Sequence, residues 1–371
     1  MSVVVVGRAA PPLQEAHAST WALLRSTAIF AGEDGVSLVD ALRETATWHA
    51  EHNPLYRRYC ELMGFVATRH LDGVVGMDRL PHLTPELLRQ WPRTGSVELG
   101  TVALPTVSGA LFTDLETQAR AWTMLASVME HEGLVSARPV HHILFARPPG
   151  PARPGAESLI AHLAGFAPPG AVTHALADRT GGIALDAAGV AEALRRASMT
   201  GEPVRLIGLP ALIAHIARAC EAWPVKLGAG SLVLTSGGWD GMRGGRPAFR
   251  AQIERALGVP AARVLDVYRL DEHAATYVEC PEHHFHAPVF TRVRAVDPVT
   301  LRSVREGDAG VLSLMNPGST AMPAHALLSG DVGRMVACGC GRKAPAFEVL
   351  GRGGKGQQTG FAARLMEMID R

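Results

Sequence analysis

The feature that most constrains the fold is a regular alternation of short apolar segments and helical segments along the middle of the chain. The apolar segments are rich in β-branched residues, which favours strands. They lie at 101–104, 142–146, 172–176, 204–208, 232–235 and 264–268. Helices are predicted between them, at 114–132, 157–164, 187–198, 211–222 and 247–257. Because strands separated by helices of this length pair in parallel through crossovers, the sequence predicts an α/β fold around a parallel sheet.

Composition and charge exclude several classes of protein. Apolar residues make up 47% of the 371 residues, which is ample for a large buried core. The net charge is +1, so nothing favours binding to nucleic acid or to an anionic membrane surface. No segment approaches the roughly 18 uninterrupted apolar residues of a spanning helix, and the first residues lack the basic start of a signal peptide. We therefore expect a cytoplasmic protein that contacts neither a membrane nor nucleic acid.

The regions on either side of the alternating segments have other patterns. Residues 10–65 are helical in pattern, with Ser37 and Asn53 as expected N-caps, and Thr84 is expected to cap a short helix further on. After Cys280 the pattern becomes that of antiparallel strands separated by Gly and Pro turns. These strands are expected at 289–296, 311–315 and 347–350. The predicted domains are an α/β domain at 1–279, a smaller β-rich subdomain at 280–350 and a short tail at 351–371.

Titratable residues follow the last strand of the predicted parallel sheet. The strand at 264–268 leads into a polar turn that contains Asp271, Glu272 and His273, and a second extended run then ends at Cys280. Enzymes of the α/β class bind ligands at the carboxyl ends of their strands, so these side chains are candidates for chemistry. The alternative is a solvated turn without a function.

Three glycine-containing loops also follow predicted strands, at 106–109, 236–240 and 329–333. Glycine lets the backbone approach a ligand closely, and exposed N–H groups suit a phosphate or the edge of a purine. In the second loop Trp239 follows two glycines. The neighbouring residues in the sequence offer its ring no packing partner, so the face of the ring could border a flat ligand. None of the loops has the spacing of a Walker or dinucleotide-binding motif, and each alone is more often an ordinary turn.

The cysteines form the second candidate site. Their number, five, argues against a disulfide framework. Cys338 and Cys340 flank a single glycine, and Cys280 precedes three histidines at positions 283, 284 and 286. Three thiolates and one imidazole would supply the four soft ligands of a structural zinc site. The alternative is a chance group of free thiols and surface histidines.

Four segments, in this order and spacing, resemble the acyl-protein synthetase family, which is the LuxE-like branch of the adenylate-forming enzymes. They are similar as well to phenylacetate–CoA ligases. The segments are 234–240 with Gly-Gly-Trp, 266–273, 329–333 with Ser-Gly-Asp-Val-Gly, and 347–352. The resemblance covers about residues 50–361 and implies the large N-terminal domain of an adenylate-forming enzyme, with the C-terminal lid missing or vestigial.

The resemblance implies a role for each candidate residue. Glu272 would ligate Mg²⁺ between the phosphates of ATP, with His273 beside it as a second catalytic residue, and Asp331 would accept hydrogen bonds from the ribose hydroxyls. The remaining nucleotide-binding residues would be Ser108, Gly109, Ser236, Gly237, Gly238, Trp239, Asp266, Tyr268, Asp271 and Arg352. Zinc-bearing relatives look similar at the cysteines, which selects His286 over the other two histidines. The implied structural zinc ligands are Cys280, His286, Cys338 and Cys340.

The sequence departs from the family pattern at four places. The phosphate loop is poor in hydroxyls and lacks a lysine, and Arg269 and Asp271 replace a glycine and a threonine of the adenylation turn. Only Lys355 lies beyond the hinge where the lid would carry a catalytic lysine. The segment 359–361, Thr-Gly-Phe, stands where an acyl-accepting cysteine is expected. An external acceptor is therefore needed.

The resemblance predicts an enzyme that activates a small carboxylic acid with ATP as an acyl-adenylate and transfers the acyl group to CoA, a carrier protein or an amine. The alternative is a degenerate relative that has lost adenylation and serves as an acyltransferase or as a partner-binding subunit in a biosynthetic complex. A zinc-stabilised interaction protein is the third reading. The sequence leaves open whether the protein forms a homodimer.

Overall fold

The structure is a computed structural model that describes residues 17–32, 35–91, 102–106, 109–149, 155–180, 182–223, 225–239, 242 and 244–353. The chain forms two compact units. The first comprises the described residues within 17–131, 269–277 and 284–353, and the second comprises those within 132–268 and 278–283. The domain boundaries predicted from the sequence stay predictions. Among the described residues, no helix is long and apolar enough to cross a membrane.

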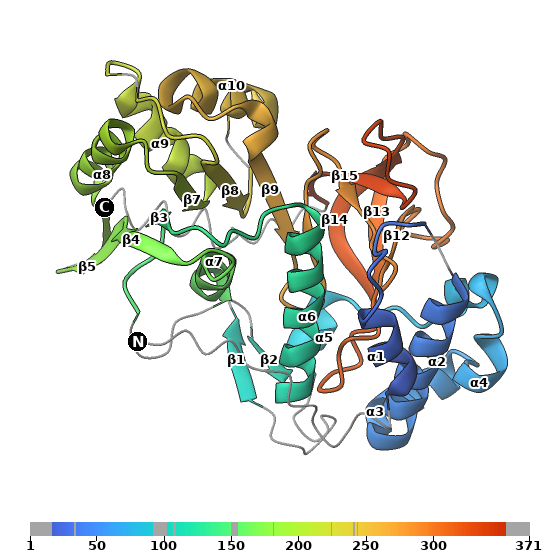
Figure 1. The fold of residues 1–371 in the computed structure, drawn as a ribbon. Helices are drawn as coiled ribbons and strands as arrows, with labels where there is room; N and C mark the ends of the chain where they lie inside the picture. The colour runs from blue at the N-terminus through green and yellow to red at the C-terminus, as the bar shows by residue number, and fades with distance from the viewer. Residues whose placement is uncertain are drawn as a thin grey trace. The chain divides into compact units, whose positions relative to one another are not determined.

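The second unit is built around strands β9, β8, β7, β3 and β4 (Figure 1), which belong to a six-stranded sheet in the order β10-β9-β8-β7-β3-β4. The strands of this sheet are β3 (Val140–Leu144), β4 (Pro169–His174), β7 (Val204–Gly208), β8 (Leu232–Ser236), β9 (Val264–Arg269) and β10 (Thr276–Val278). The pairs from β4 through β9 are all parallel. β3 and β7 are buried along their whole length, as expected for parallel strands covered by helices.

The helices of this unit pack their apolar residues on the sheet. They are α7 (Gly155–Ala164), α8 (Ala187–Thr200), α9 (Pro210–Cys220) and α10 (Gly245–Leu257). Leu212, Ile213 and Ile216 of α9 join Ile253 of α10 and Val233 of β8 in one apolar core. The predicted α/β fold with a parallel sheet is therefore confirmed. Between β4 and α8 the chain adds a hairpin, β5 (Leu176–Arg179) with β6 (Gly182–Leu185), that the sequence did not predict.

Helices fill the N-terminal part of the first unit. They are α1 (Ala18–Leu24), α2 (Gly35–His52), α3 (Pro54–Leu62), α4 (Ala67–His70), the 3₁₀ helix η2 (Val74–Arg79), α5 (Pro85–Arg89) and α6 (Leu115–His131). Two predicted N-caps are confirmed, because Asn53 accepts a hydrogen bond from the Tyr56 N–H at 3.0 Å and Thr84 accepts one from the Leu87 N–H at 3.4 Å. The prediction for Ser37 is wrong, since α2 already begins at Gly35.

Buried histidines connect these helices to the strands and loops of the same unit. His49 of α2 contacts the Ser319 carbonyl through Nε2 at 3.0 Å, and the Tyr56 hydroxyl of α3 lies 2.7 Å from His325 Nε2. Burial lowers the pKa of His49 to about 4 and that of His325 well below its ordinary value. Both imidazoles are therefore neutral at pH 7.

The first unit also contains a five-stranded antiparallel sheet in the order β11-β15-β14-β13-β12. Its strands are β11 (Phe285–His286), β12 (Arg292–Val296), β13 (Gly310–Met315), β14 (Ala326–Val336) and β15 (Ala346–Arg352). The segment 329–333 was predicted as a loop, and this is wrong because it lies inside β14. The strand tolerates its glycines because Gly330 has a φ of +77° and the register shifts between Val332 and Gly333.

The predicted phosphate loop lies in a hairpin of the first unit. β1 (Val102–Thr106) pairs antiparallel with β2 (Gly109–Thr113), and Thr106 is opposite Gly109. The sequence predicted that the strand at 101–104 joins the parallel sheet and leads into a loop, and this is wrong because the strand pairs antiparallel with β2, which the sequence did not predict. Ser108 and the predicted tail from residue 354 onward, including Lys355, lie outside the described residues.

Candidate functional site

The glycine loop that follows β8 is one half of the candidate site. Ser236 ends the strand and is half-buried, and Gly237 and Gly238 are exposed. Gly237 has a φ of +117°, a region that residues with a Cβ rarely adopt. The sequence therefore places glycine where the backbone turns away from the strand and leaves its polar groups accessible.

Trp239 of this loop has several packing partners, contrary to the expectation from sequence. Its Nε1 donates a hydrogen bond to Asp266 Oδ2 at 2.8 Å. Its ring lies 5.0 Å from the Arg246 guanidinium and meets the ring of Phe249 edge-on, at a centroid distance of 5.2 Å. The sequence did not reveal these contacts because Arg246 and Phe249 come from α10, whose packing on β8 and β9 is a tertiary effect.

Asp266 lies on β9, beside the loop, and is 4% exposed. It accepts hydrogen bonds from Thr235 Oγ1 at 2.8 Å and from Arg246 Nη2 at 2.9 Å, besides the one from Trp239. Burial, with the nearby charge of Glu279, raises the pKa of Asp266 to about 6 despite these donors. The predicted residues Ser236, Gly237, Gly238, Trp239 and Asp266 thus belong to one contiguous group.

Glu279 and Arg250 form a second charged pair in the same unit, which the sequence analysis did not identify. Arg250 Nη2 contacts both oxygens of Glu279, at 2.8 and 2.7 Å, and the Asp266 N–H donates to Glu279 Oε2 at 2.8 Å. Burial opposes ionisation of Glu279, but His283 and Arg250 favour the charged form, so its pKa is lowered. The signal in the sequence was the spacing of Arg246 and Arg250, one helical turn apart on α10.

The other predicted residues lie on β9 and in the turn that follows it. Tyr268 is half-buried, and Asp271 is exposed. Glu272 is buried and forms an ion pair with Arg89 of α5, in which Nη2 lies 2.6 Å from Oε1. Burial raises the pKa of Glu272 although Arg89 opposes the shift. His273 is buried, its Nε2 lies 2.8 Å from the Tyr277 hydroxyl, and burial lowers its pKa to about 3.

Asp331 lies on β14 next to the irregularity in that strand. It is 5% exposed, its N–H donates to Ser329 Oγ at 3.1 Å, and Arg352 Nε lies 3.3 Å from its Oδ1. The two predicted residues Asp331 and Arg352 are therefore paired across β14 and β15.

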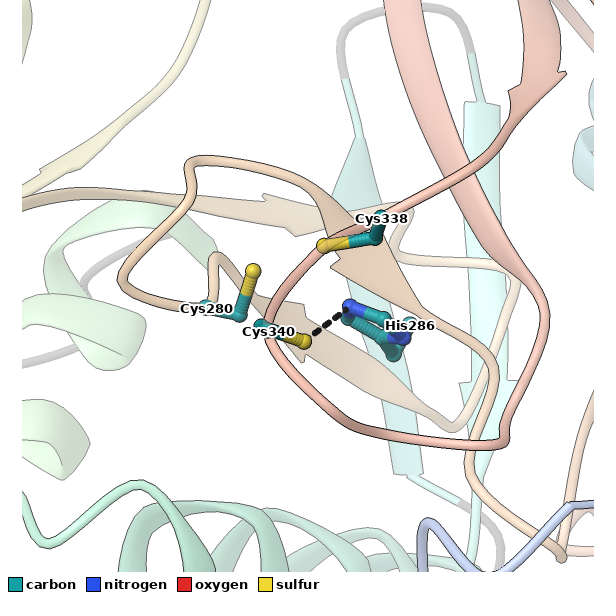
Figure 2. Close-up of side chains that lie close together, drawn as sticks. All are labelled: Cys280, His286, Cys338 and Cys340. Carbon is teal, nitrogen blue, oxygen red and sulfur yellow. Dashed lines mark hydrogen bonds between the residues drawn. The ribbon is translucent and has the colours of Figure 1, made fainter.

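The cysteine and histidine residues predicted to bind zinc form one cluster. Cys280 follows β10, His286 lies on β11, and Cys338 and Cys340 lie between β14 and β15. Their ligand atoms all lie within 4.8 Å of one another, and Figure 2 shows the four side chains arranged around a common space. Cys340 Sγ is 3.2 Å from His286 Nε2. A cluster of three sulfurs and one imidazole nitrogen at this spacing is compatible with a metal site.

The environment of His286 also fits a metal ligand. Its Nδ1 lies 3.0 Å from the Ala344 carbonyl, so the ring holds its proton on Nδ1 and directs a lone pair on Nε2 toward the sulfurs. Burial lowers the pKa of His286, which keeps the ring neutral, as metal binding requires. His283 and His284 contact Glu279 and Glu348 instead, at 3.7 and 3.4 Å.

The C-terminal half of the chain matches a known protein family. A model of the family described as acyl-protein synthetase, LuxE, matches residues 177–369. A long-chain-fatty-acid–luciferin-component ligase of Aliivibrio fischeri is 26% identical over 146 residues. This match covers 38% of the chain and 38% of the relative, so well under two thirds of the relative is represented.

Solved structures resemble the chain over more of its length. A 2-hydroxyisobutyryl-CoA ligase in an open conformation with 2-HIB-AMP and CoA has a TM-score of 0.66 at 17% identity, over 86% of this chain and 69% of that chain. The same ligase in the postadenylation state with R3-HIB-AMP gives 0.65 at 18%, over 86% and 67%. At this identity the likeness shows the fold alone, which is that of an adenylate-forming ligase as the sequence predicted.

Proposed function

Because the chain belongs to the acyl-protein synthetase family LuxE, we propose that it activates a carboxylic acid with ATP and transfers the acyl group to an external thiol or amine. A carboxylate oxygen would attack the α-phosphorus of ATP, the bond to the bridging oxygen would break, and pyrophosphate would leave. The nucleophile would then attack the acyl carbon, and AMP would leave. The observation that carries the proposal is the family match, which spans the Trp239 loop, Glu272 and Asp331.

The residues suit the roles that the proposal gives them. Trp239, Gly237 and Gly238 would border the adenine, because this loop combines exposed backbone with a ring held in place. Asp331 would accept hydrogen bonds from the ribose hydroxyls. The proposed nucleotide site further includes Ser108, Gly109, Ser236, Asp266, Tyr268, Asp271 and Arg352. Catalysis at such a site is mainly alignment and charge neutralisation.

Glu272 fits a magnesium ligand because it is a buried carboxylate that already holds a cationic group, the guanidinium of Arg89. Bound Mg²⁺ would neutralise phosphate charge at the reacting centre. His273 is neutral at pH 7 and contacts Tyr277, so it would support the turn that carries Glu272 and would not act as a charged acid.

The Cys/His cluster is proposed to hold a structural zinc ion. Four protein ligands complete a tetrahedral shell and leave no position open for a substrate. The ion would tie the end of β10 to β11 and to the connection between β14 and β15. It has no part in the proposed chemical steps.

The cysteines also support an external acyl acceptor. Cys60 and Cys220 are buried, and burial raises the pKa of each thiol, which makes both poor nucleophiles. The other three cysteines belong to the cluster. These observations support an acceptor from outside the chain, such as CoA, a carrier-protein thiol or an amine. The similar proteins are named for a long-chain fatty acid and for 2-hydroxyisobutyryl-CoA. For this chain we propose a small carboxylic acid as the substrate.

The test is exchange of labelled pyrophosphate into ATP, measured with Mg²⁺ and a panel of carboxylic acids. We expect exchange that depends on one class of acid and falls at least ~100-fold in Glu272→Gln, which removes the metal ligand. The matched control is Asp308→Asn, an exposed acid in a turn, which should exchange like the wild type. If the folded protein exchanges with no acid and binds no ATP, the degenerate alternative is correct, and a stable partner should then be recovered.

A further inference from the structure

The carboxylate of Asp266 accepts hydrogen bonds from three side chains of the protein itself. Thr235 Oγ1 donates to Oδ1 at 2.8 Å. Trp239 Nε1 at 2.8 Å, Arg246 Nη2 at 2.9 Å and Arg246 Nε at 3.2 Å all donate to Oδ2. The side chain is buried, so these donors replace the water that an ionised carboxylate would otherwise bind. A carboxylate with this set of partners has little capacity left for hydrogen bonds from a ligand.

We propose that Asp266 is a positioning residue that acts through Trp239, and that it fixes the indole plane in the loop beside the nucleotide. This inference rests on the proposed function, because it takes the loop that follows β8 as the base-binding loop. It changes the expected role of Asp266 from direct nucleotide ligand to support for the residue that contacts the base.

The contacts around Trp239 show how the ring is held. Asp266 fixes the Nε1 edge, the Arg246 guanidinium lies over the ring at 5.0 Å, and Phe249 meets it at an interplanar angle of 81°. Asp266 also pairs with Arg246, so one carboxylate orients both groups that contact the ring. A ring ordered before the ligand arrives avoids the entropy loss of ordering it during binding.

Replacement of the carboxylate by an amide would disrupt this arrangement. An Asn side chain has one oxygen and one NH₂ group, whereas the carboxylate of Asp266 accepts from Thr235, Trp239 and Arg246. With the NH₂ group toward Trp239 and Arg246, donors would face donors and the ring would lose its partner. With the NH₂ group toward Thr235, whose hydroxyl can accept, the amide oxygen would still accept from Trp239 but would lack the charge that attracts Arg246.

The first unit contains a matched control for the substitution. Glu116 is also buried and accepts hydrogen bonds from an indole, Trp21 Nε1 at 3.2 Å, and from a guanidinium, Arg120 Nη2 at 2.8 Å. Glu116→Gln removes the same kind of charge from the same kind of partners. It should lower thermal stability without changing nucleotide affinity.

The experiment is a double-mutant cycle in the affinity of the full chain for AMP, measured by titration calorimetry. Asp266→Asn and Trp239→Phe are each expected to weaken AMP binding about tenfold. The double variant is expected to bind no more weakly than the worse single variant, because both changes remove one arrangement. Asp266→Ser, whose shorter side chain withdraws the acceptor from Trp239 Nε1, repeats the cycle and also serves if the Asn variant does not fold.

The outcomes separate the two proposals. Additive losses, with the double variant about 100-fold weaker, would mean that Asp266 contacts the nucleotide directly and would overturn the positioning role alone. AMP affinity that is unchanged in both Asp266→Asn and Asp266→Ser would overturn it as well. If the wild type binds neither AMP nor ATP, the proposed function fails and this inference fails with it. If Asp266 had only a structural role, Asp266→Asn would lower the melting temperature, as is expected of Glu116→Gln, but its effect on AMP affinity would not be coupled to that of Trp239→Phe.

Discussion

The same three chemical groups, a carboxylate, an indole and a guanidinium, meet at two places in the molecule. Asp266, Trp239 and Arg246 meet at the carboxyl end of β8 and β9, and Glu116, Trp21 and Arg120 meet on α6 and α1. In the second trio the acid and the arginine are one turn apart on one helix, and the arginine is fully buried. In the first trio the three residues come from a strand, a glycine loop and a helix, and the Arg246 side chain is 25% exposed.

The two trios differ in their surroundings and not in the chemistry of their side chains. The trio on α6 joins two helices in a closed interior. The trio beside β8 lies at the end of a parallel sheet, next to two exposed glycines. We expect the trio on α6 to act as a structural brace and the trio beside β8 to support a binding site.

The largest effect on stability is expected at the Cys/His cluster, where a zinc ion, and not an arginine as in the two trios, is proposed to hold the polar side chains together. Removal of zinc by a chelator, or by Cys340→Ser, should lower the free energy of unfolding on the order of several kcal/mol, because the four ligands then lose the ion that holds them together. Elemental analysis and thermal melts measure this. Cys220→Ala, outside the cluster, should retain the metal. A protein purified without metal, with melts that a chelator does not change, would contradict the zinc site.

Arg120→Met should destabilise the protein by ~3–5 kcal/mol, because it leaves Glu116 buried without its counter-ion. Equilibrium unfolding in urea measures the change. The control is Arg195→Met, which removes an exposed arginine paired with Glu192 and should change stability by less than about 0.5 kcal/mol. If the two variants are equally stable, the trio on α6 is not a brace.

The pH dependence of stability should report His49, which lies near Arg120. Its folded pKa, about 4, is below the ordinary value of 6.5, so the folded state disfavours the proton. The contribution of His49 to the free energy of unfolding is therefore fully present above pH 6.5. It is lost as the pH falls from 6.5 toward 4, and the loss amounts to about 3 kcal/mol. Urea unfolding at several pH values should show a shallower slope in His49→Gln. An identical slope in both proteins would exclude His49 as a source.

Arg246→Met should have the smallest effect on stability, about 2 kcal/mol, because water can reach part of the guanidinium site and Thr235 and Trp239 still donate to Asp266. Urea unfolding measures this change, and titration with AMP should show a loss of affinity as well. A variant that loses stability but binds AMP like the wild type would make this trio a brace like the other.

The parallel sheet and its helices could be predicted from the sequence because their apolar patterns are local. β7 has its predicted bounds, and α8 and α10 begin within two residues of prediction. β14 was missed because its glycines read as a turn, whereas an irregular register accommodates them inside the strand. Antiparallel strands with such irregularities leave a weaker pattern than buried parallel ones.

The candidate site was predictable in part for a similar reason. The three cysteines and a set of three histidines stood out because thiolates and an imidazole are the soft ligands that zinc takes, the resemblance selected His286 among the histidines, and the structure brings the four residues together. The partners Arg89, Arg246 and Arg250 were missed because an arginine on a helix looks like any solvated residue. Only tertiary packing shows that Arg89 pairs with Glu272 and that Arg246 lies over Trp239.

The most direct test of the acyl-adenylate proposal follows an oxygen atom from the acid. The protein is incubated with ATP, Mg²⁺, an ¹⁸O-labelled carboxylic acid that supports exchange, and hydroxylamine as the acyl acceptor. The products are examined by mass spectrometry. We predict that one labelled oxygen appears in AMP, because the carboxylate oxygen that attacks the α-phosphorus stays with AMP when the acyl group leaves. Label in orthophosphate, or acyl hydroxamate formed with unlabelled AMP, would contradict activation through an acyl-adenylate.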